Sequence, residues 1–191
     1  MGKEKALIGE AAQFPSVGRR RFRAARSRYA FTAVEIVIVC LVLIILATVV
    51  IPQFSRASQQ SKQNSLHDVL QLLRTQVAVF KAQHQDVPPG YPGGNPTLSP
   101  TADAVAAQMT EHSDVNCRLS QNPDASYQYG PYLSALPVNP MNGSSSVEMV
   151  GNNQPLPAPD GKTGWIYKPQ TQEIIANVTG KDASGTSYSN Y

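Results

Sequence analysis

The chain has 191 residues, of which 41% are apolar and 15% charged, and its formal net charge is +3. The apolar residues are unevenly spread, because residues 31–51 contain 18 of them in 21 positions. The rest of the chain is about one-third apolar, below the ~45–50% usual for globular proteins. This distribution argues against an all-soluble protein, and the absence of a second such run argues against a polytopic transporter.

Charge divides the chain at the same place. Residues 1–30 carry eight basic and two acidic side chains, a net +6, whereas residues 31–191 carry eight basic and eleven acidic ones, a net −3. A basic segment is a candidate for nucleic-acid binding. Here it directly precedes an apolar run, where membrane topology signals occur, so we expect a membrane partner and no nucleic acid.

Residues 31–51 are long enough to cross a bilayer as a helix, spanning about 31 Å against a hydrocarbon core of ~30 Å. The basic residues before them predict a cytoplasmic N-terminus and an external C-terminal part. A secretory signal peptide and a twin-arginine signal at Arg19-Arg20-Arg21-Phe22 are the alternatives. Neither is followed by a suitable cleavage site, because Ile51-Pro52-Gln53-Phe54 is a poor one, so we expect a retained anchor.

One acidic residue, Glu35, lies inside the apolar run. An acidic side chain there costs on the order of 2.5–3.5 kcal/mol on insertion scales and marks a functional candidate. No Lys or Arg occurs between Phe31 and Ile51 to pair with it. A free α-amino group, created by cleavage just before Phe31, would be the missing cation.

The pattern predicts that the helix continues beyond the membrane to about His84. Apolar residues recur there at steps of three and four, which is typical of one buried helix face: Leu66, Val69, Leu70, Leu73, Val77 and Phe80. Pro52 removes a main-chain donor and predicts a kink, and Pro88-Pro89-Gly90 predicts the end. Residues 55–65 are polar on all sides, so packing alone cannot hold them helical.

The remaining segment, residues 86–191, begins with a Pro- and Gly-rich linker and predicts a small head domain. A short helix is expected at residues 101–111 and consecutive turns at residues 136–143. Strands are expected at residues 147–150, 165–168 and 173–177, the last two forming a hairpin. A sheet of two or three strands is only marginally stable by itself and needs the long helix as a packing face. The fold class predicted is therefore α+β, with a small antiparallel sheet packed on the long helix.

The N-terminal motif resembles the leader and first helix of type IV pilins and type II secretion pseudopilins. The matching residues are Arg28-Tyr29-Ala30, Phe31-Thr32-Ala33-Val34-Glu35 and the apolar run that closes at Pro52. The resemblance implies that prepilin peptidase cuts between Ala30 and Phe31 and methylates the new amino group of Phe31. It also implies that Glu35 pairs with the amino terminus of a neighbouring subunit during assembly. Ala30 departs from the family, which usually has Gly there.

The head is similar to that of the major pseudopilin of type II secretion. The similarity lies in Tyr129-Gly130-Pro131-Tyr132-Leu133, residues 136–143 and Gly164-Trp165-Ile166-Tyr167. That family commonly binds calcium in its C-terminal loop, which implies Asp182 as the candidate ligand here. Asp182 is the only carboxylate side chain after Glu173, however, and a hydrogen-bonded Asp turn is the alternative.

We expect no enzymatic activity, because the sequence contains no nucleophile elbow, phosphate loop or paired cysteines. His67, His84 and His112 have no ligand-like spacing. Cys117 is the only cysteine outside the predicted anchor, so the head cannot form an internal disulfide. A buried thiol and a disulfide between chains both remain open.

The expected domains are a leader (1–30), a transmembrane segment (31–52), a periplasmic helical spine (53–85) and the head (86–191). The resemblance implies a pseudopilus subunit of the bacterial inner membrane, with its head in the periplasm. Its implied partners are prepilin peptidase, copies of itself, minor pseudopilins and the inner-membrane secretion platform. A type IV pilin for adhesion, motility or DNA uptake, and a non-polymerising signal-anchored binding module, are the alternative functions.

Overall fold

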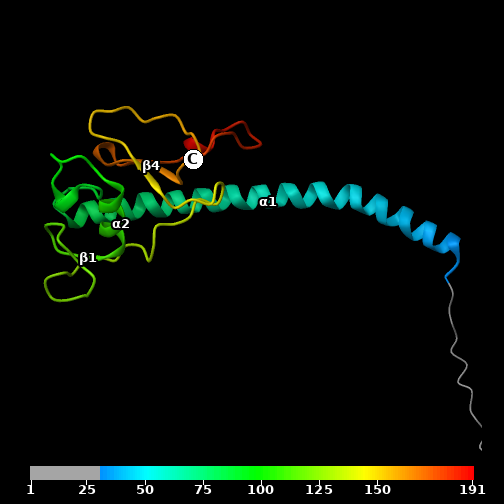
Figure 1. The fold of residues 1–191 in the computed structure, drawn as a ribbon, viewed down its shortest axis with the longest axis horizontal. Helices are drawn as coiled ribbons and strands as arrows, with labels where there is room; N and C mark the ends of the chain where they lie inside the picture. Colours follow the sequence, from blue (N-terminus) through cyan, green and yellow to red (C-terminus); the bar gives the residue numbers. More distant parts are fainter. Residues whose placement is uncertain (1–30) are drawn as a thin grey trace, which may run out of the picture. The chain divides into compact units, whose positions relative to one another are not determined.

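The computed structural model describes residues 31–191, apart from the side chains of residues 49–52. The predicted leader, with Ala30 at its end, therefore lies outside the described residues. The chain divides into two compact units, Met1–Leu46 and Ala47–Tyr191. One helix, α1, spans Ala33–Gln83 and belongs to both units (Figure 1).

Helix α1 begins with a side-chain cap. The Oγ1 atom of Thr32 accepts a hydrogen bond of 3.2 Å from the main-chain N–H of Glu35. Threonine is favoured at this place because its side chain satisfies an N–H that lacks a partner within the helix. The prediction of one helix from Thr32 to about His84 is confirmed in its extent.

The C-terminal end of α1 is set by two residues with left-handed main-chain angles. Gln85 and Asp86 have φ values of 53° and 67°, and Asp86 donates its N–H to the Lys81 carbonyl at 3.1 Å. The Lys81 ammonium also lies 3.2 Å from the Asp86 carboxylate, a favourable position for a cation at a helix C-terminus. The helix thus ends at Gln83, five residues before Pro88 and one residue before the predicted end.

The predicted apolar face of α1 is the centre of the core. Its residues Leu66, Leu70, Leu73, Val77 and Phe80 are at most 4% exposed, while Val69 is half-buried. They pack with the side chains of the central sheet in a single cluster. Burying a side chain of this size contributes about 1.5–3 kcal/mol, so this face binds the head to the helix.

The short helix α2 spans Ala102–Thr110 and is capped by Thr101, whose Oγ1 accepts from the Ala104 N–H at 3.2 Å. It buries Val105 and Met109 in the core. Figure 1 shows α2 and strand β1 near the end at which α1 finishes. The predicted helix at residues 101–111 is therefore confirmed.

Three strands form the main sheet in the order β3-β4-β5. They span Val147–Met149, Trp165–Lys168 and Glu173–Ala176, which matches the prediction within one residue. Strands β4 and β5 pair antiparallel with Trp165 opposite Ala176. They are joined by the 3₁₀ turn η2, Pro169–Thr171, and by Gln172 in a left-handed conformation.

The expectation of a purely antiparallel sheet requires one correction. Strand β3 pairs parallel with β4, with Val147 opposite Trp165, so the main sheet is mixed. A parallel pair requires a crossover connection, and residues 150–164 provide it without a helix. Gly164 lies at its end, where an added Cβ would clash with the Ser144 carbonyl oxygen. This close approach places β4 beside the turns that precede β3.

A second, two-stranded antiparallel sheet was not predicted. Its strands are β1, His112–Ser113, and β2, Leu119–Ser120. Both are too short and polar to show an alternating apolar pattern. The remaining turns of 3₁₀ type are η1, Pro92–Gly94, and η3, Tyr188–Asn190.

The predicted turns at residues 136–143 are held from inside by a buried amide. Asn139 is fully buried, donates from Nδ2 to the Gly164 carbonyl at 2.7 Å and accepts from the Met141 N–H at 2.9 Å. The Trp165 indole N–H donates to the Pro137 carbonyl at 2.9 Å. These bonds satisfy buried polar groups and tie the turns to β4.

Candidate functional site

The start of α1 carries the residues that the sequence assigns to assembly. Phe31 is 71% exposed, and Glu35 is exposed in the first helical turn. Thr32-Ala33-Val34-Glu35 also has the spacing of a capping box, in which a threonine and a glutamate three residues later satisfy helical N–H groups. The structure contains the threonine half of this arrangement. No ion pair joins Glu35 to another residue in 31–191, the part described.

The first half of α1 exposes its apolar side chains in the described part of the chain. From Val34 to Leu46 its large apolar side chains are between 49% and 68% exposed. Within the described chain, α1 is the one helix long and apolar enough to cross a membrane, with a peak mean hydropathy of 3.3. An apolar helix exposed on all sides is typical of a membrane span or a helix bundle.

The predicted kink at Pro52 stays a prediction. Helix α1 continues through this position, and the side chain of Pro52 is among those outside the description. Beyond it, residues 53–62 are helical and exposed throughout.

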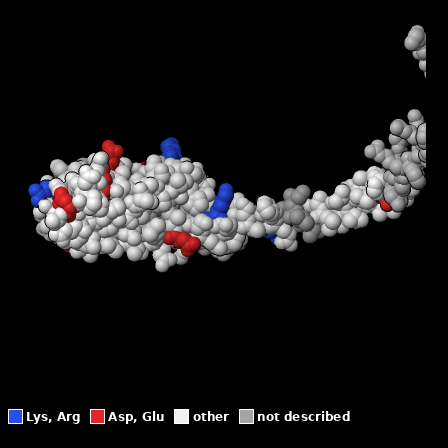
Figure 2. All heavy atoms as spheres, turned by 90° about the horizontal axis from the view of Figure 1, so that it is seen from below, with Lys and Arg blue, Asp and Glu red and all other residues white. Residues whose placement is uncertain are grey.

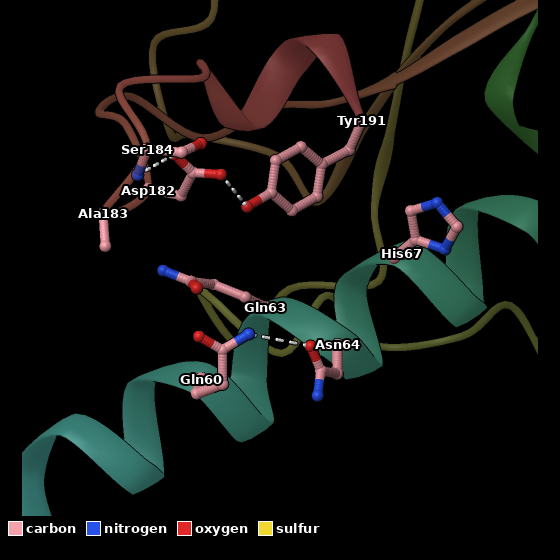
Figure 3. Close-up of a pocket in the computed structure, with 8 residues that line it drawn as sticks. All are labelled: Gln60, Gln63, Asn64, His67, Asp182, Ala183, Ser184 and Tyr191. Carbon is pink, nitrogen blue, oxygen red and sulfur yellow. Dashed lines mark hydrogen bonds between the residues drawn. The ribbon is translucent and has the colours of Figure 1, made fainter.

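Asp182 organises the C-terminal loop by accepting four hydrogen bonds, and Figure 3 shows its carboxylate between Ser184 and Tyr191. Its Oδ1 accepts from the Ser184 N–H at 2.8 Å, the Ser184 hydroxyl at 2.6 Å and the Thr186 N–H at 2.9 Å. Its Oδ2 accepts from the Tyr191 hydroxyl at 2.9 Å. The bond from the Ser184 hydroxyl, aided by those from Thr186 and Tyr191, lowers the pKa of Asp182 to about 2.

These surroundings do not fit a calcium site. Calcium takes about six to eight oxygen ligands, usually with several carboxylates. Asp182 is the lone carboxylate in its loop, and both of its oxygens already accept from protein donors. In the described residues, no three His, Cys, Asp or Glu side chains gather as a metal-binding group. The geometry corresponds to the alternative of a hydrogen-bonded Asp turn, and calcium at Asp182 remains an untested hypothesis.

The same loop is fastened to α1 by side chains of the helix. Gln63 donates from Nε2 to the Tyr188 hydroxyl at 3.1 Å, and Arg74 donates to the main-chain oxygen of Tyr191. Arg74 also donates to the Ile174 carbonyl, which lies in strand β5 outside the loop. The His67 and Tyr191 rings meet edge to face at 6.5 Å. We call residues 180–191 with these helix contacts the C-terminal latch.

A cleft of about 380 Å³ lies between α1 and the latch. Figure 3 shows its side chains on the helix facing those of the loop. The lining residues are Gln60, Gln63, Asn64, His67, Asp182, Ala183, Ser184 and Tyr191. Five of these eight residues carry an amide or a hydroxyl group, and the carboxylate of Asp182 is engaged in the latch. The sequence had not singled out this cleft, because its two walls are more than a hundred residues apart.

The other cysteine and histidine candidates take structural places in the head. Cys117 is 4% exposed, and burial, followed by the nearby Asp114 charge, raises the pKa of its thiol to about 11. This corresponds to the buried-thiol alternative. His67 lies within α1 and lines the cleft, whereas His84 directly follows the helix and is buried. His84 is 1% exposed and forms a network that the sequence did not predict.

The His84 ring is fixed by two hydrogen bonds. Its Nδ1 lies 2.7 Å from the Phe80 carbonyl and its Nε2 lies 2.9 Å from the Ser113 hydroxyl. Because a carbonyl only accepts, Nδ1 carries the proton and Nε2 accepts from Ser113. The ring stacks on Phe80 at 3.8 Å. Burial lowers the pKa of His84 below its ordinary 6.5, so this histidine is a neutral part of the core.

A scan against protein-family models, a search of curated proteins and a search of solved structures found no match for this chain. The function must therefore be argued from its own residues and fold.

Proposed function

We propose that this chain is a type IV pilin-like subunit, most similar to the major pseudopilin of type II secretion, that polymerises into a periplasmic filament. In this proposal it is a structural protein and not an enzyme. It is held in the bacterial inner membrane with its N-terminus in the cytoplasm and its head in the periplasm. Its partners are prepilin peptidase, further copies of itself, minor pseudopilins and the inner-membrane secretion platform.

The observation that carries the proposal is the difference in side-chain exposure between the two halves of α1. In its first half, the large apolar residues from Val34 to Leu46 are between 49% and 68% exposed. In its second half, five apolar residues are at most 4% exposed and belong to the core of the head. A single helix of 51 residues thus joins an exposed apolar rod to a folded domain. Membrane lipid before assembly, and neighbouring helices after it, would cover the rod.

The start of α1 supports the same mechanism. Removal of residues 1–30 would create an amino group at Phe31, one helical turn from Glu35. The Thr32 cap holds the helix start, so Glu35 projects from a defined backbone position. Pairing of this carboxylate with the amino terminus of a neighbouring subunit would offset the penalty of placing a charge in an apolar environment and would set the register between subunits.

The proposal is tested at the N-terminus of the protein. The full chain is produced in cells with and without prepilin peptidase, and its N-terminal peptide is examined by mass spectrometry. We expect N-methyl-Phe31 with the peptidase and an intact leader without it. A chain that keeps its leader when the peptidase is present would contradict the proposal. That outcome would favour the alternative of a signal-anchored binding module.

The type IV pilin alternative predicts the same processed N-terminus. It is separated from the pseudopilin by the neighbouring genes, which would encode retraction machinery in a pilus system. A secretion ATPase and minor pseudopilins would accompany a pseudopilin.

A further inference from the structure

The part of α1 next to the predicted membrane segment has no buried residue in the described chain, and only one of its faces lines clefts beside the C-terminal latch. Residues 53–62, here called the basic stretch, are helical and exposed without exception. Even Phe54 is 78% exposed. A helical segment without a buried residue gains little stability from packing within its own chain, so a contact with another molecule would stabilise it.

The charges of the basic stretch are both positive. Arg56 and Lys62 have no acidic residue three or four positions away on either side, the spacing at which helical side chains meet. In the described residues 31–191, no ion pair involves either of them. Since no acidic residue occurs between Glu35 and Asp68, the stretch itself carries only positive charge. The Asp182 carboxylate across the cleft from Gln60 already accepts hydrogen bonds within the latch.

The opposite charge is concentrated in residues 86–132, here called the acidic end. It contains five acidic residues and one basic residue, Arg118, a net −4. Asp86 is paired with Lys81, and Asp114 with Arg118 at 2.7 Å. The other three carboxylates have no ion pair among the described residues: Asp103, Glu111 and Asp124. Figure 2 shows the charged side chains of one face as separate small groups on a mostly neutral surface.

Within one chain the two charged surfaces are far apart. The acidic end lies at the C-terminal end of α1, because Tyr132 donates to Gln83 at 2.6 Å and Ser113 to His84 at 2.9 Å. Lys62 and Gln83 are 21 residues apart, or about 32 Å along a helix. Salt screens charges beyond about 8 Å at physiological ionic strength, so one copy cannot bring these charges together.

We propose that the basic stretch of one copy docks against the acidic end of a second copy displaced along the helix axis. The inference rests on the proposed filament function and names the contact between subunits. Arg56 and Lys62 then face carboxylates among Asp103, Glu111 and Asp124 of the other copy. Two different surfaces meet in such a contact, so it is heterologous and repeats as an open helix, as a filament requires.

A zero-length carbodiimide, which joins an amine to a carboxylate as an amide, tests the contact directly. It is applied to filaments of the full-length, matured chain, followed by digestion and mass spectrometry. Lys62 is the only lysine between residues 31 and 80, so its peptide is unambiguous. We expect amide links from Lys62 to Asp103, Glu111 or Asp124. The separation within one chain means that any such link joins two copies.

A charge swap tests whether the contact is required. The spine variant Arg56→Glu/Lys62→Glu, and the end variant Asp103→Lys/Glu111→Lys/Asp124→Lys, should each reduce filament yield roughly tenfold at low salt. The chain with all five changes should recover wild-type yield, because opposite charges again face each other. Lys181→Glu is the matched control for one exposed lysine and should assemble normally. Thermal melting of each variant verifies that the head is folded.

The outcomes separate this inference from the proposed function. Two outcomes overturn the contact and leave the filament function in place. One is wild-type filaments that contain no Lys62 links. The other is a folded chain with all five substitutions that does not recover assembly. A correctly processed wild-type chain that forms no filament overturns both.

Discussion

Glu35 has two physical roles available at the start of α1. It occupies the third helical position after Thr32, where an acidic side chain is favoured both by a capping box and by the positive end of the helix dipole. It is also the carboxylate assigned to pairing with a neighbouring amino terminus. The first role needs hydrogen-bonding atoms, whereas the second needs a charge, so one substitution distinguishes them.

Glu35→Gln should insert into the membrane and keep the helix start, yet lose filament assembly. Glutamine completes a capping box as glutamate does, but it is neutral and cannot form an ion pair with an amine. We expect at least a tenfold fall in filament yield, similar to that of Glu35→Leu, measured by filament sedimentation and immunoblotting. Wild-type yield from Glu35→Gln, with loss only in Glu35→Leu, would assign this residue to capping instead.

His84 predicts the acid sensitivity of the head. Burial lowers its pKa below 6.5, so the folded state disfavours the protonated ring while the unfolded state accepts the proton. The full stability is therefore present above pH 6.5 and declines as the pH falls through the lower folded-state pKa. Thermal melts between about pH 8 and about pH 5 should show this decline.

The variant His84→Gln isolates this contribution, because an amide can still donate to the Phe80 carbonyl and accept from Ser113. We expect a lower melting temperature at neutral pH and a weaker decline below it. An unchanged decline in the folded variant would place the acid sensitivity elsewhere.

At the scale of elements, the C-terminal latch is held together mainly by hydrogen bonds to one carboxylate, that of Asp182. The lowered pKa of Asp182 means that its contribution is complete above its ordinary 3.8 and is lost as the pH falls toward about 2. Burial and the Asp182 contact raise the pKa of Tyr191 to about 12, so its hydroxyl remains a donor at neutral pH. The hydrogen bond from Tyr191 to Asp182 is thus present over the physiological pH range.

Asp182→Asn should loosen the latch and lower the melting temperature by a few degrees, because the carboxylate accepts from four donors that an amide cannot all satisfy. Tyr191→Phe, which removes one donor, should have a smaller effect. The melting temperature of the wild type should be the same with calcium and with a chelator. A calcium-dependent rise that Asp182→Asn removes would instead establish the metal site that the family resemblance implies.

The elements were predictable to different degrees for physical reasons. Helix α1 and strands β4 and β5 carry strong local patterns, the three- and four-residue apolar step and the aliphatic and aromatic runs beside Pro169. Strands β1 and β2 carry none, because they are two residues long and their pairing depends on the Asp114 turn. Asp114 accepts from the Asn116 and Arg118 N–H groups at 2.9 Å, and these bonds reverse the chain.

For the whole molecule, the net charge of +3 conceals two positive regions and one negative region. The N-terminal segment is +6, the basic stretch carries two cations that have no ion pair within residues 31–191, and the acidic end is −4. The first of these predicts a cytoplasmic N-terminus, because positive residues beside a membrane span tend to stay in the cytoplasm. The other two lie at opposite ends of the helical spine, and their separation is the basis of the proposed contact between subunits.

The sequence by itself determined the long helix, its apolar half, its buried face and the positions of the main strands. These depend on composition and periodicity over neighbouring residues. Only the tertiary structure decided the parallel pairing of β3, the His84 network and the saturation of Asp182. The first two depend on groups brought together from distant positions, such as Ser113 with His84. The third depends on how the last loop turns back so that Ser184, Thr186 and Tyr191 reach one carboxylate. Local periodicity does not encode such meetings, because they arise only when the chain folds back on itself.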